Sequence, residues 1–206
     1  MEKSPYKAHW ERVWTEKGQR EVSWFQERPE VSLRLLERVG TDPSSSLIDV
    51  GGGASLLVDH LVARAFQRVV VADISERSLA RAKARLGEQA NTVTWLEADV
   101  TTDDLGGPYD VWHDRALFHF LVKSSDQEAY QRQLRSALRP GGRAIVATFG
   151  RDGPAKCSGL PVSRYGPREL AAALGDRMVL EHQERELHRT PWGTEQAFIW
   201  GLLRRR

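Results

Sequence analysis

The sequence predicts a single α/β domain whose mostly parallel, doubly wound sheet ends in an antiparallel hairpin. Short apolar stretches alternate with helical stretches from Ser46 onward, which is the order of successive βαβ units. The last two strand-like stretches, 178–189 and 195–204, are separated by only five residues. That connection is too short for a crossover helix, so these two strands should pair antiparallel. A chain of 206 residues suits one such domain with a sizeable core.

The individual elements follow from local patterns of apolar, glycine and proline residues. Short apolar runs predict seven strands, at 46–50, 68–74, 92–100, 109–116, 143–149, 178–189 and 195–204. Helical spacing of apolar residues predicts helices at 7–17, 30–39, 55–66, 76–87, 126–138 and 166–174. Ser75 is suited to cap the helix that follows it, and Pro140 with the next two glycines is a helix stop. Polar, Gly, Pro and Ser residues predict loops at 18–29, 42–46 and 150–163.

Composition argues against several classes of protein. The net charge is only +2, without the concentrated basic face of a nucleic-acid binder. Cys157 is the only cysteine, and no Cys/His cluster has zinc-ligand spacing, so we expect neither a disulfide nor a metal. The polar N-terminus lacks a signal peptide, and no apolar run approaches the ~18 residues that span a bilayer. We therefore expect a soluble, cytoplasmic protein that binds neither nucleic acid nor a membrane.

The first predicted strand runs into a glycine-rich loop that begins at Asp49 and holds Gly51, Gly52 and Gly53. Ligands of doubly wound sheets bind at the carboxyl ends of the strands, where glycines let a ligand lie against bare main chain. A dinucleotide site would place Gly or Ala where Leu56 stands, and no Gly-Lys-Ser/Thr follows for a P-loop. The acid beside the loop favours a cationic ligand, so S-adenosylmethionine, with its ammonium and sulfonium, suits the loop best.

Two further aspartates close the second and third predicted strands. Asp73 is placed to accept hydrogen bonds from both hydroxyls of a ribose. Asp99 is placed to accept one from the exocyclic amine of an adenine. An aspartate at the end of a strand is by itself more often part of a turn, but together with Asp49 these acids would line one crevice. The trio therefore strengthens the prediction of an adenosine cofactor.

With these residues the chain resembles the class I S-adenosylmethionine-dependent methyltransferases over about residues 46–204. The motifs that carry the resemblance are DVGGGAS (49–55), VADIS (71–75), LEADV (96–100), YDVWHDRA (109–116) and LRPGGRAIVATF (138–149). The loop departs from the usual acid-x-Gly-x-Gly-x-Gly because Ser55 replaces the last glycine. The resemblance implies a Rossmann-like fold with helices on both faces of a seven-stranded sheet. It also implies S-adenosylmethionine as cofactor and S-adenosylhomocysteine as product.

The resemblance also implies roles for individual residues. Those assigned to the cofactor are Asp49, Gly51, Gly52, Gly53, Asp73, Ile74, Asp99, Val100 and His113. Among them, Ile74 would pack on the adenine, and the main chain of Val100 would face the adenine edge. His113 and Asp114, at the end of the fourth strand, would lie near the transferred methyl and are the expected catalytic residues.

The N-terminal stretch 9–26 carries a narrower likeness, to bacterial methyltransferases of unassigned substrate and more loosely to protein-lysine methyltransferases. In such enzymes this segment closes over the cofactor, so we expect residues 1–40 to form a lid on the core at 46–204 within one domain, 1–206. The residues expected to line a substrate pocket are Trp14, Trp24, Phe25, Arg115, Cys157 and Tyr165. For Arg115, pairing with Asp114 and holding an acidic substrate both remain open.

The methyl acceptor is less well defined than the cofactor. HDRA stands where amino-methylating enzymes for adenine or glutamine carry an Asn/Asp-Pro-Pro-aromatic run, and no RNA platform is evident. The chain has no inserted cap domain, which favours a small nucleophile such as a thiol or carboxylate. A protein lysine is the alternative acceptor. A non-catalytic S-adenosylmethionine binder and a nicotinamide-dependent oxidoreductase are the rival classes, and the chain is expected to be a monomer or homodimer.

Overall fold

The computed structural model describes residues 5–206 and contains one seven-stranded sheet with strand order β3-β2-β1-β4-β5-β9-β8. The strands are β1 (Ser46–Val50), β2 (Arg68–Asp73), β3 (Val93–Glu97), β4 (Tyr109–Arg115), β5 (Leu138–Phe149), β8 (Met178–Arg189) and β9 (Glu195–Arg205). Strands β1 to β5 pair in parallel, whereas β9 pairs antiparallel with both β5 and β8. The predicted doubly wound sheet with its C-terminal antiparallel hairpin is confirmed.

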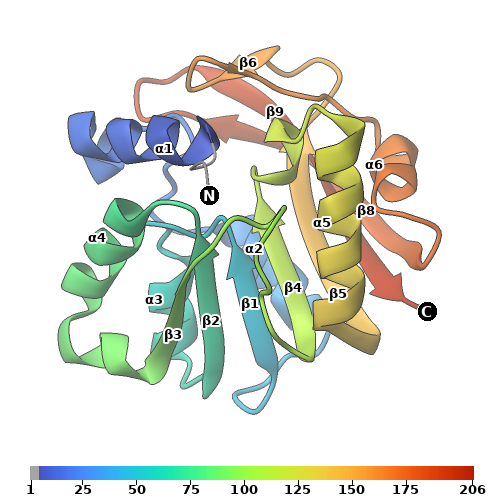
Figure 1. The fold of residues 1–206 in the computed structure, drawn as a ribbon, viewed down its shortest axis with the longest axis horizontal. Helices are drawn as coiled ribbons and strands as arrows, with labels where there is room; N and C mark the ends of the chain where they lie inside the picture. The colour runs from blue at the N-terminus through green and yellow to red at the C-terminus, as the bar shows by residue number, and fades with distance from the viewer. Residues whose placement is uncertain (1–4) are drawn as a thin grey trace.

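Helices cover both faces of this sheet (Figure 1). They are α1 (Pro5–Glu16), α2 (Glu30–Arg38), α3 (Leu57–Ala63), α4 (Glu76–Leu86), α5 (Ser124–Ala137) and α6 (Pro167–Ala173). Helices α2, α3 and α4 share one buried cluster with the sheet, and α5 and α6 share a second cluster on the opposite face. As predicted, Ser75 caps α4, because its hydroxyl accepts a hydrogen bond from the backbone N–H of Ser78.

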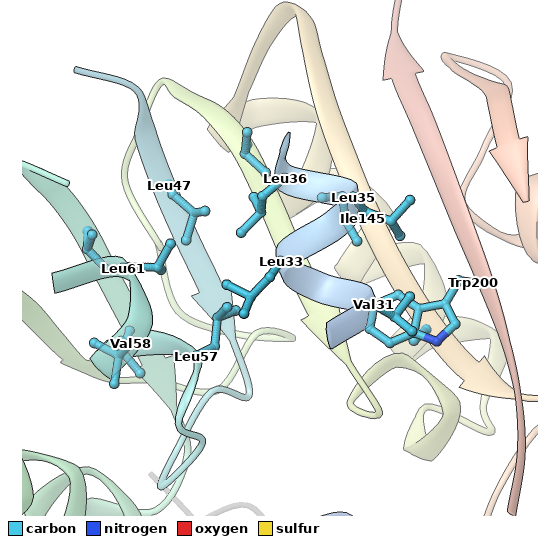
Figure 2. Close-up of a cluster of buried hydrophobic side chains, with 14 of the residues drawn as sticks. Val31, Leu33, Leu35, Leu36, Leu47, Leu57, Val58, Leu61, Ile145 and Trp200 are labelled. Carbon is cyan, nitrogen blue, oxygen red and sulfur yellow. The ribbon is translucent and has the colours of Figure 1, made fainter. Parts of the chain in front are cut away.

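The strands are apolar because they are buried beneath helices, as the face covered by α2 and α3 illustrates. Figure 2 shows leucines of α2 and α3 meeting side chains of β1 and β5. Leu33, Leu47 and Leu57 are each at most 1% exposed. Burial of a leucine contributes about 1.5–3 kcal/mol, so this cluster fixes α2 and α3 against the strands. Helix α2 is thereby held against the sheet, with Ser32 beside His113 of β4.

Helix α3 is shorter at both ends than the predicted 55–66, and three further differences from the sequence prediction have a clear physical cause. Strand β5 begins at Leu138, not at residue 143, because the Pro-Gly-Gly stretch stays extended and bulges opposite Tyr109 and Val111. Strand β3 ends at Glu97, because the Asp99 carboxylate accepts hydrogen bonds from Thr101 and turns the chain. The expected loop 150–163 contains a small hairpin of β6 (Lys156–Cys157) and β7 (Leu160–Pro161).

The N-terminal segment lies across the carboxyl edge of the sheet. Figure 1 shows α1 above the ends of β1 and β2, in contact with the region of α4. Residues 18–29, here called the strap, run from α1 to α2 and include a short 3-10 helix, Gln19–Glu21. The first four residues of the expected lid, 1–4, lie outside the described residues. Over the described part of the chain, no helix is both long enough and apolar enough to cross a membrane.

Candidate cofactor and acceptor site

A single cleft opens at the carboxyl ends of β1, β2, β3 and β4, beneath α1 and the strap. Its non-atom space, open mouth included, is about 1280 Å³. All nine residues that the sequence assigned to the cofactor line this cleft, as do Trp14, Trp24, Phe25 and Arg115 of the expected substrate pocket. The acids lie at or near the ends of β1, β2 and β3, which we call the cofactor end. Trp10, Trp24 and Phe120 meet at what we call the aromatic end. The topology therefore brings together residues that lie far apart in the sequence, from Tyr6 to Leu121.

The glycine loop is shaped by the carboxylates that approach it. Gly51 and Gly53 have φ of +71° and +44°, which a side chain would strain. Gly52 has no such φ, but a Cβ there would lie 2.5 Å from Asp49 Oδ2. At Gly53 a Cβ would lie 2.7 Å from Asp73 Oδ2. Glycine is thus required so that two carboxylates can lie against the loop, which explains the predicted motif in physical terms.

Asp49 is held by a buried chain of hydrogen bonds. Its Oδ1 lies 2.7 Å from Nδ1 of His113, and Nε2 of His113 lies 2.9 Å from the hydroxyl of Ser32 on α2. The sheet register creates the first contact, because Asp49 and His113 are Cα partners across β1 and β4. The hydroxyl donates to Nε2 when Nδ1 carries the proton toward the carboxylate. Both ring nitrogens of His113 are therefore engaged within the protein.

The other two acids are oriented by the turns that follow their strands. One oxygen of Asp73 accepts a hydrogen bond from the Ser75 backbone N–H at 2.8 Å. Burial raises the pKa of the Asp73 carboxyl to about 6. Oδ1 of Asp99 accepts from both the backbone and the hydroxyl of Thr101. Each acid therefore has one oxygen fixed by its turn and a second oxygen that is not part of these contacts.

Asp114 does not reach the cleft. Neighbouring residues of a strand point to opposite faces, so Asp114 lies on the side of α5 while His113 and Arg115 lie on the side of α2. Its oxygens accept hydrogen bonds from the backbone N–H groups of Leu117 and Phe118 and from the hydroxyl of Tyr130. Burial raises the pKa of the Asp114 carboxyl to about 6. This geometry corrects the expectation of a catalytic Asp114 and makes the residue an anchor for the turn after β4.

The other end of the cleft is aromatic and carries one cation. The Trp10 ring centroid lies 5.7 Å from that of Trp24 and 5.0 Å from that of Phe120, both edge to face. Arg115 donates from Nη1 to the Trp24 carbonyl at 2.9 Å, and its guanidinium lies 4.9 Å from the centroid of the Phe198 ring. Burial lowers the pKa of Arg115. The Asp114–Arg115 pairing that the sequence left open does not occur, because the two side chains lie on opposite faces.

The lid is fastened to the core through backbone carbonyls. Arg81 of α4 donates to the carbonyls of Trp14 and Lys17, both at 2.6 Å. The strap is held at Ser23, whose carbonyl lies 2.7 Å from Nε2 of His188. Gln19 and Gln26 add side-chain contacts to Ala54 and Glu186. These contacts, most of them to carbonyl oxygens, hold α1 and the strap over the cleft.

Two expected pocket residues lie elsewhere. Cys157 is buried in the cluster beneath α2 and the strap, and burial raises the pKa of its thiol to about 11, which keeps it protonated and poorly nucleophilic. Tyr165 belongs to the opposite face, where its ring lies 5.7 Å from that of Phe118. Both are absent from the cleft lining among the described residues. The loop after β5 therefore packs against the core and does not shape this cleft.

Several lining residues were not predicted. They include Tyr6, Trp10, Gln26, Leu105, Phe120 and Leu121. Trp10 and Gln26 belong to the N-terminal stretch that was expected to close over the cofactor, so the aromatic and polar composition of that stretch was the available signal. Phe120 lies in a mostly apolar run, so the sequence indicated a buried core residue and not a cleft residue. Ser32 was also missed, and its signal was a hydroxyl on the otherwise apolar buried face of α2.

Comparison with known proteins agrees with this geometry. Residues 48–144 match the family described as a methyltransferase domain. The methyltransferase tpcM of Aspergillus fumigatus is 28% identical over 144 residues, covering 70% of this chain and 42% of tpcM. A SAM-dependent methyltransferase structure from Anabaena variabilis aligns with a TM-score of 0.76, at 15% identity over 98% of this chain and 96% of that one.

A second solved structure carries ligands. The Burkholderia thailandensis 1,6-didemethyltoxoflavin-N1-methyltransferase, with 1,6-didemethyltoxoflavin and S-adenosylhomocysteine bound, aligns with a TM-score of 0.71. It is 19% identical, over all of this chain and 91% of that one. The chain spans less than half the length of the curated relatives that it matches.

The fold and the cleft define a Rossmann-like protein with a cleft at the carboxyl ends of its parallel strands. The segment that matches the methyltransferase-domain family, residues 48–144, holds the glycine loop and all three of Asp49, Asp73 and Asp99. S-adenosylmethionine fits the residues present, because the Asp49 carboxylate beside the glycine loop and the Asp73 carboxylate at the end of β2 occur in one lining.

Proposed function

We propose that the protein transfers a methyl group from S-adenosylmethionine to a small molecule bound at the aromatic end of the cleft. The observation that carries this proposal is the continuity of the cleft, in which the acid-lined end and the aromatic end share one lining. The bound cofactor supplies the electrophilic methyl on a sulfonium, which is already a good leaving group. What the protein must add is alignment of the acceptor and exclusion of water.

The cofactor end supplies binding and orientation. Asp49 lies where it would attract the ammonium of the methionine part, and its hydrogen bond to His113 keeps the carboxylate turned toward the loop. Asp73 would accept from the ribose hydroxyls through the oxygen that Ser75 does not use. Ile74, Asp99 and Val100 would enclose the adenine. In this proposal His113 positions Asp49, which replaces the direct catalytic role expected from the sequence.

The aromatic end suits a flat, apolar acceptor. Rings of α1, the strap and the segment after β4 meet edge to face around it, and such surfaces bind planar ligands through area and stacking. The relative with a bound toxoflavin precursor methylates a small molecule, which supports the same substrate class here. A reducing, cytoplasmic setting and a monomeric or homodimeric state remain parts of the proposal.

Isothermal titration with S-adenosylmethionine, with NAD as the control, tests the cofactor. Tritiated S-adenosylmethionine is then incubated with the protein and a bacterial lysate divided into a small-molecule filtrate and a protein fraction. We expect micromolar binding of S-adenosylmethionine, none of NAD, and label in the filtrate only. Label on a discrete protein band would identify a protein acceptor instead, and binding without any transfer would identify a sensor.

A further inference from the structure

We propose that Arg115 binds a carboxylate of the methyl acceptor, so that the substrate is an acidic small molecule with a flat apolar body. The inference rests on the methyl-transfer function proposed above and narrows its substrate class. It is carried by the hydrogen-bond state of one buried cation at the aromatic end of the cleft.

Only one of the three guanidinium nitrogens of Arg115 donates a hydrogen bond within the protein. Nη1 donates to the Trp24 carbonyl, but Nε and Nη2 are enclosed and have no partner among residues 5–206. Nε and Nη2 form the side edge of the guanidinium, which presents two parallel N–H groups. That edge matches the two oxygens of a carboxylate, in the bidentate geometry that distinguishes arginine from lysine. The unused part of Arg115 is therefore the part best suited to a carboxylate.

No acid among residues 5–206 satisfies this edge. Asp114 lies on the opposite face, and Asp49 is bonded to His113. Glu186 is the acid whose charge acts most strongly on Arg115, yet its oxygens accept from Gln26 and Trp200, each at 2.8 Å. A buried cation without a paired anion is costly, because burial removes its hydration without replacing it. An acceptor carboxylate would supply the missing charge.

A second unpartnered donor lies in the same buried region. Nδ1 of His119 accepts from the Phe149 backbone N–H at 3.4 Å, so Nε2 carries the proton, and Nε2 has no partner in the described chain. Burial and the Arg115 charge lower the pKa of His119 to about 3, which keeps the ring neutral. The neutral His119 ring therefore places a second N–H donor near Arg115 and does not neutralise the Arg115 charge. Arg115 and His119 thus both leave buried donors without a partner in this region, and an anion would satisfy such donors.

The distribution of charge along the cleft agrees with this assignment. Asp49, Asp73 and Asp99 lie at the cofactor end, whereas Arg115 is the one lysine or arginine among the described lining residues. Trp10, Trp24 and Phe120 lie in the same lining and leave an apolar, planar environment for the rest of the acceptor. An acid at one end of the acceptor would therefore orient its other end toward the cofactor.

The direct test uses benzoate as a probe and benzamide as its neutral counterpart, with S-adenosylhomocysteine present. The Nε–H signal of Arg115 in ¹H–¹⁵N spectra, assigned by its loss in R115K, reports the contact without any need for activity. We expect millimolar benzoate to shift this signal and to raise the melting temperature of the wild type, and benzamide to do neither. R115Q should abolish the thermal response to benzoate, whereas R185Q, which changes an exposed arginine paired with Asp152, should retain it.

The kinetic test uses the labelled acceptors of the lysate filtrate, separated on an anion-exchange resin. We expect the acceptors to be retained by the resin, and R115Q to raise their KM at least ~30-fold while leaving the dissociation constant for S-adenosylmethionine within about twofold. R115K should give a smaller rise, because it restores the charge but not the paired donors. A merely structural Arg115 would instead lower the melting temperature and kcat with little change in KM.

The two proposals fail in different ways. Acceptors that pass through the resin, or an unchanged KM in R115Q, would overturn the carboxylate site and leave methyl transfer intact. Absence of any transferred label would overturn the proposed function, and the benzoate measurement would then decide the anion site alone. Equal responses to benzoate and benzamide, or no response to either, would overturn the anion site in that case.

Discussion

The two ends of the cleft are built by different means. The cofactor end comes from the tips of adjacent parallel strands, and its key contact, Asp49 to His113, follows from the register of β1 with β4. The acceptor end comes from α1, the strap and the end of β4, which lie far apart in the sequence. Its closure depends on side chains that bind backbone carbonyls, such as Arg115 to Trp24 and Arg81 to Trp14.

This difference predicts different responses to mutation. At the cofactor end the supporting atoms are buried in the sheet, so small changes should act directly on cofactor affinity with little change in the lid. At the acceptor end Arg115 binds both the strap and, by our proposal, the substrate, so substrate binding and closure of the lid should be coupled. Substitutions in the hydrogen-bonded series Asp49–His113–Ser32 and in its neighbours test this view. The loss of cofactor affinity should decrease with distance from the cofactor.

The largest effect is expected for Asp49→Asn. The substitution removes the negative charge that would face the ammonium and also weakens the contact with His113. Loss of one partner of a buried charged pair costs about 2–5 kcal/mol, so the dissociation constant for S-adenosylmethionine should rise by about 100-fold. Titration calorimetry measures it, with the exposed Asp176→Asn as control. An affinity within threefold of the wild type would show that Asp49 does not face the cofactor.

Gly52→Ala should have the next largest effect. An alanine Cβ at this position would lie 2.5 Å from Asp49 Oδ2 and 3.0 Å from a methyl carbon of Val71. The backbone of Gly52 is compatible with alanine, so the substitution acts by displacing the carboxylate and not by strain. We expect cofactor affinity to fall by roughly 30-fold. Gly40→Ala is the opposite control, since its φ is +71° and no atom lies within 4 Å. It should lower the melting temperature and leave affinity unchanged.

Asp73 should make cofactor binding depend on pH. Its pKa is raised to about 6 by burial, so lowering the pH through 6 protonates the carboxyl and removes an acceptor for the ribose hydroxyls. Affinity should therefore be full above pH 7 and should fall by up to about tenfold per pH unit below 6. Asp73→Ala should weaken binding about 10- to 100-fold at pH 8 and abolish this pH dependence. A slope that survives in the variant would assign the titration to another group.

The fold was predictable because its signals are local. Each strand is a short apolar run, the glycine loop is contiguous, and Asp73 and Asp99 stand where strands end, so sequence alone brought them to one edge. The end of β3 and the start of β5 were misplaced because an aspartate turn and a bulge decide them, and both depend on neighbouring strands. Local patterns therefore defined the elements well and their ends less well.

The acceptor end was only partly predictable, because it is assembled by tertiary contacts. Asp114 and Arg115 are neighbours on β4, so their side chains point to opposite faces, but only the tertiary packing decides which of the two faces the cleft. Cys157 and Tyr165 follow β5 in a loop that folds back onto the core, which the loop sequence does not reveal. Which edge of the Arg115 guanidinium has no hydrogen-bond partner can be seen only in the three-dimensional structure.

The smallest effect is expected for Ser32→Ala, at the far end of the chain from the cofactor. The substitution leaves Nε2 of His113 buried without its hydroxyl partner, while the contact of His113 with Asp49 remains. An unsatisfied buried group costs about 1–3 kcal/mol of stability, and we expect only about a threefold loss of cofactor affinity on top of that. Thr148→Val is the matched control, because the buried Thr148 hydroxyl has no partner in the described chain. It should not lower stability, because no hydrogen bond is lost, and it should leave cofactor affinity unchanged. If Ser32→Ala lowered stability yet left affinity unchanged, the hydroxyl would support only the packing of α2 and Asp49 would be oriented by His113 alone.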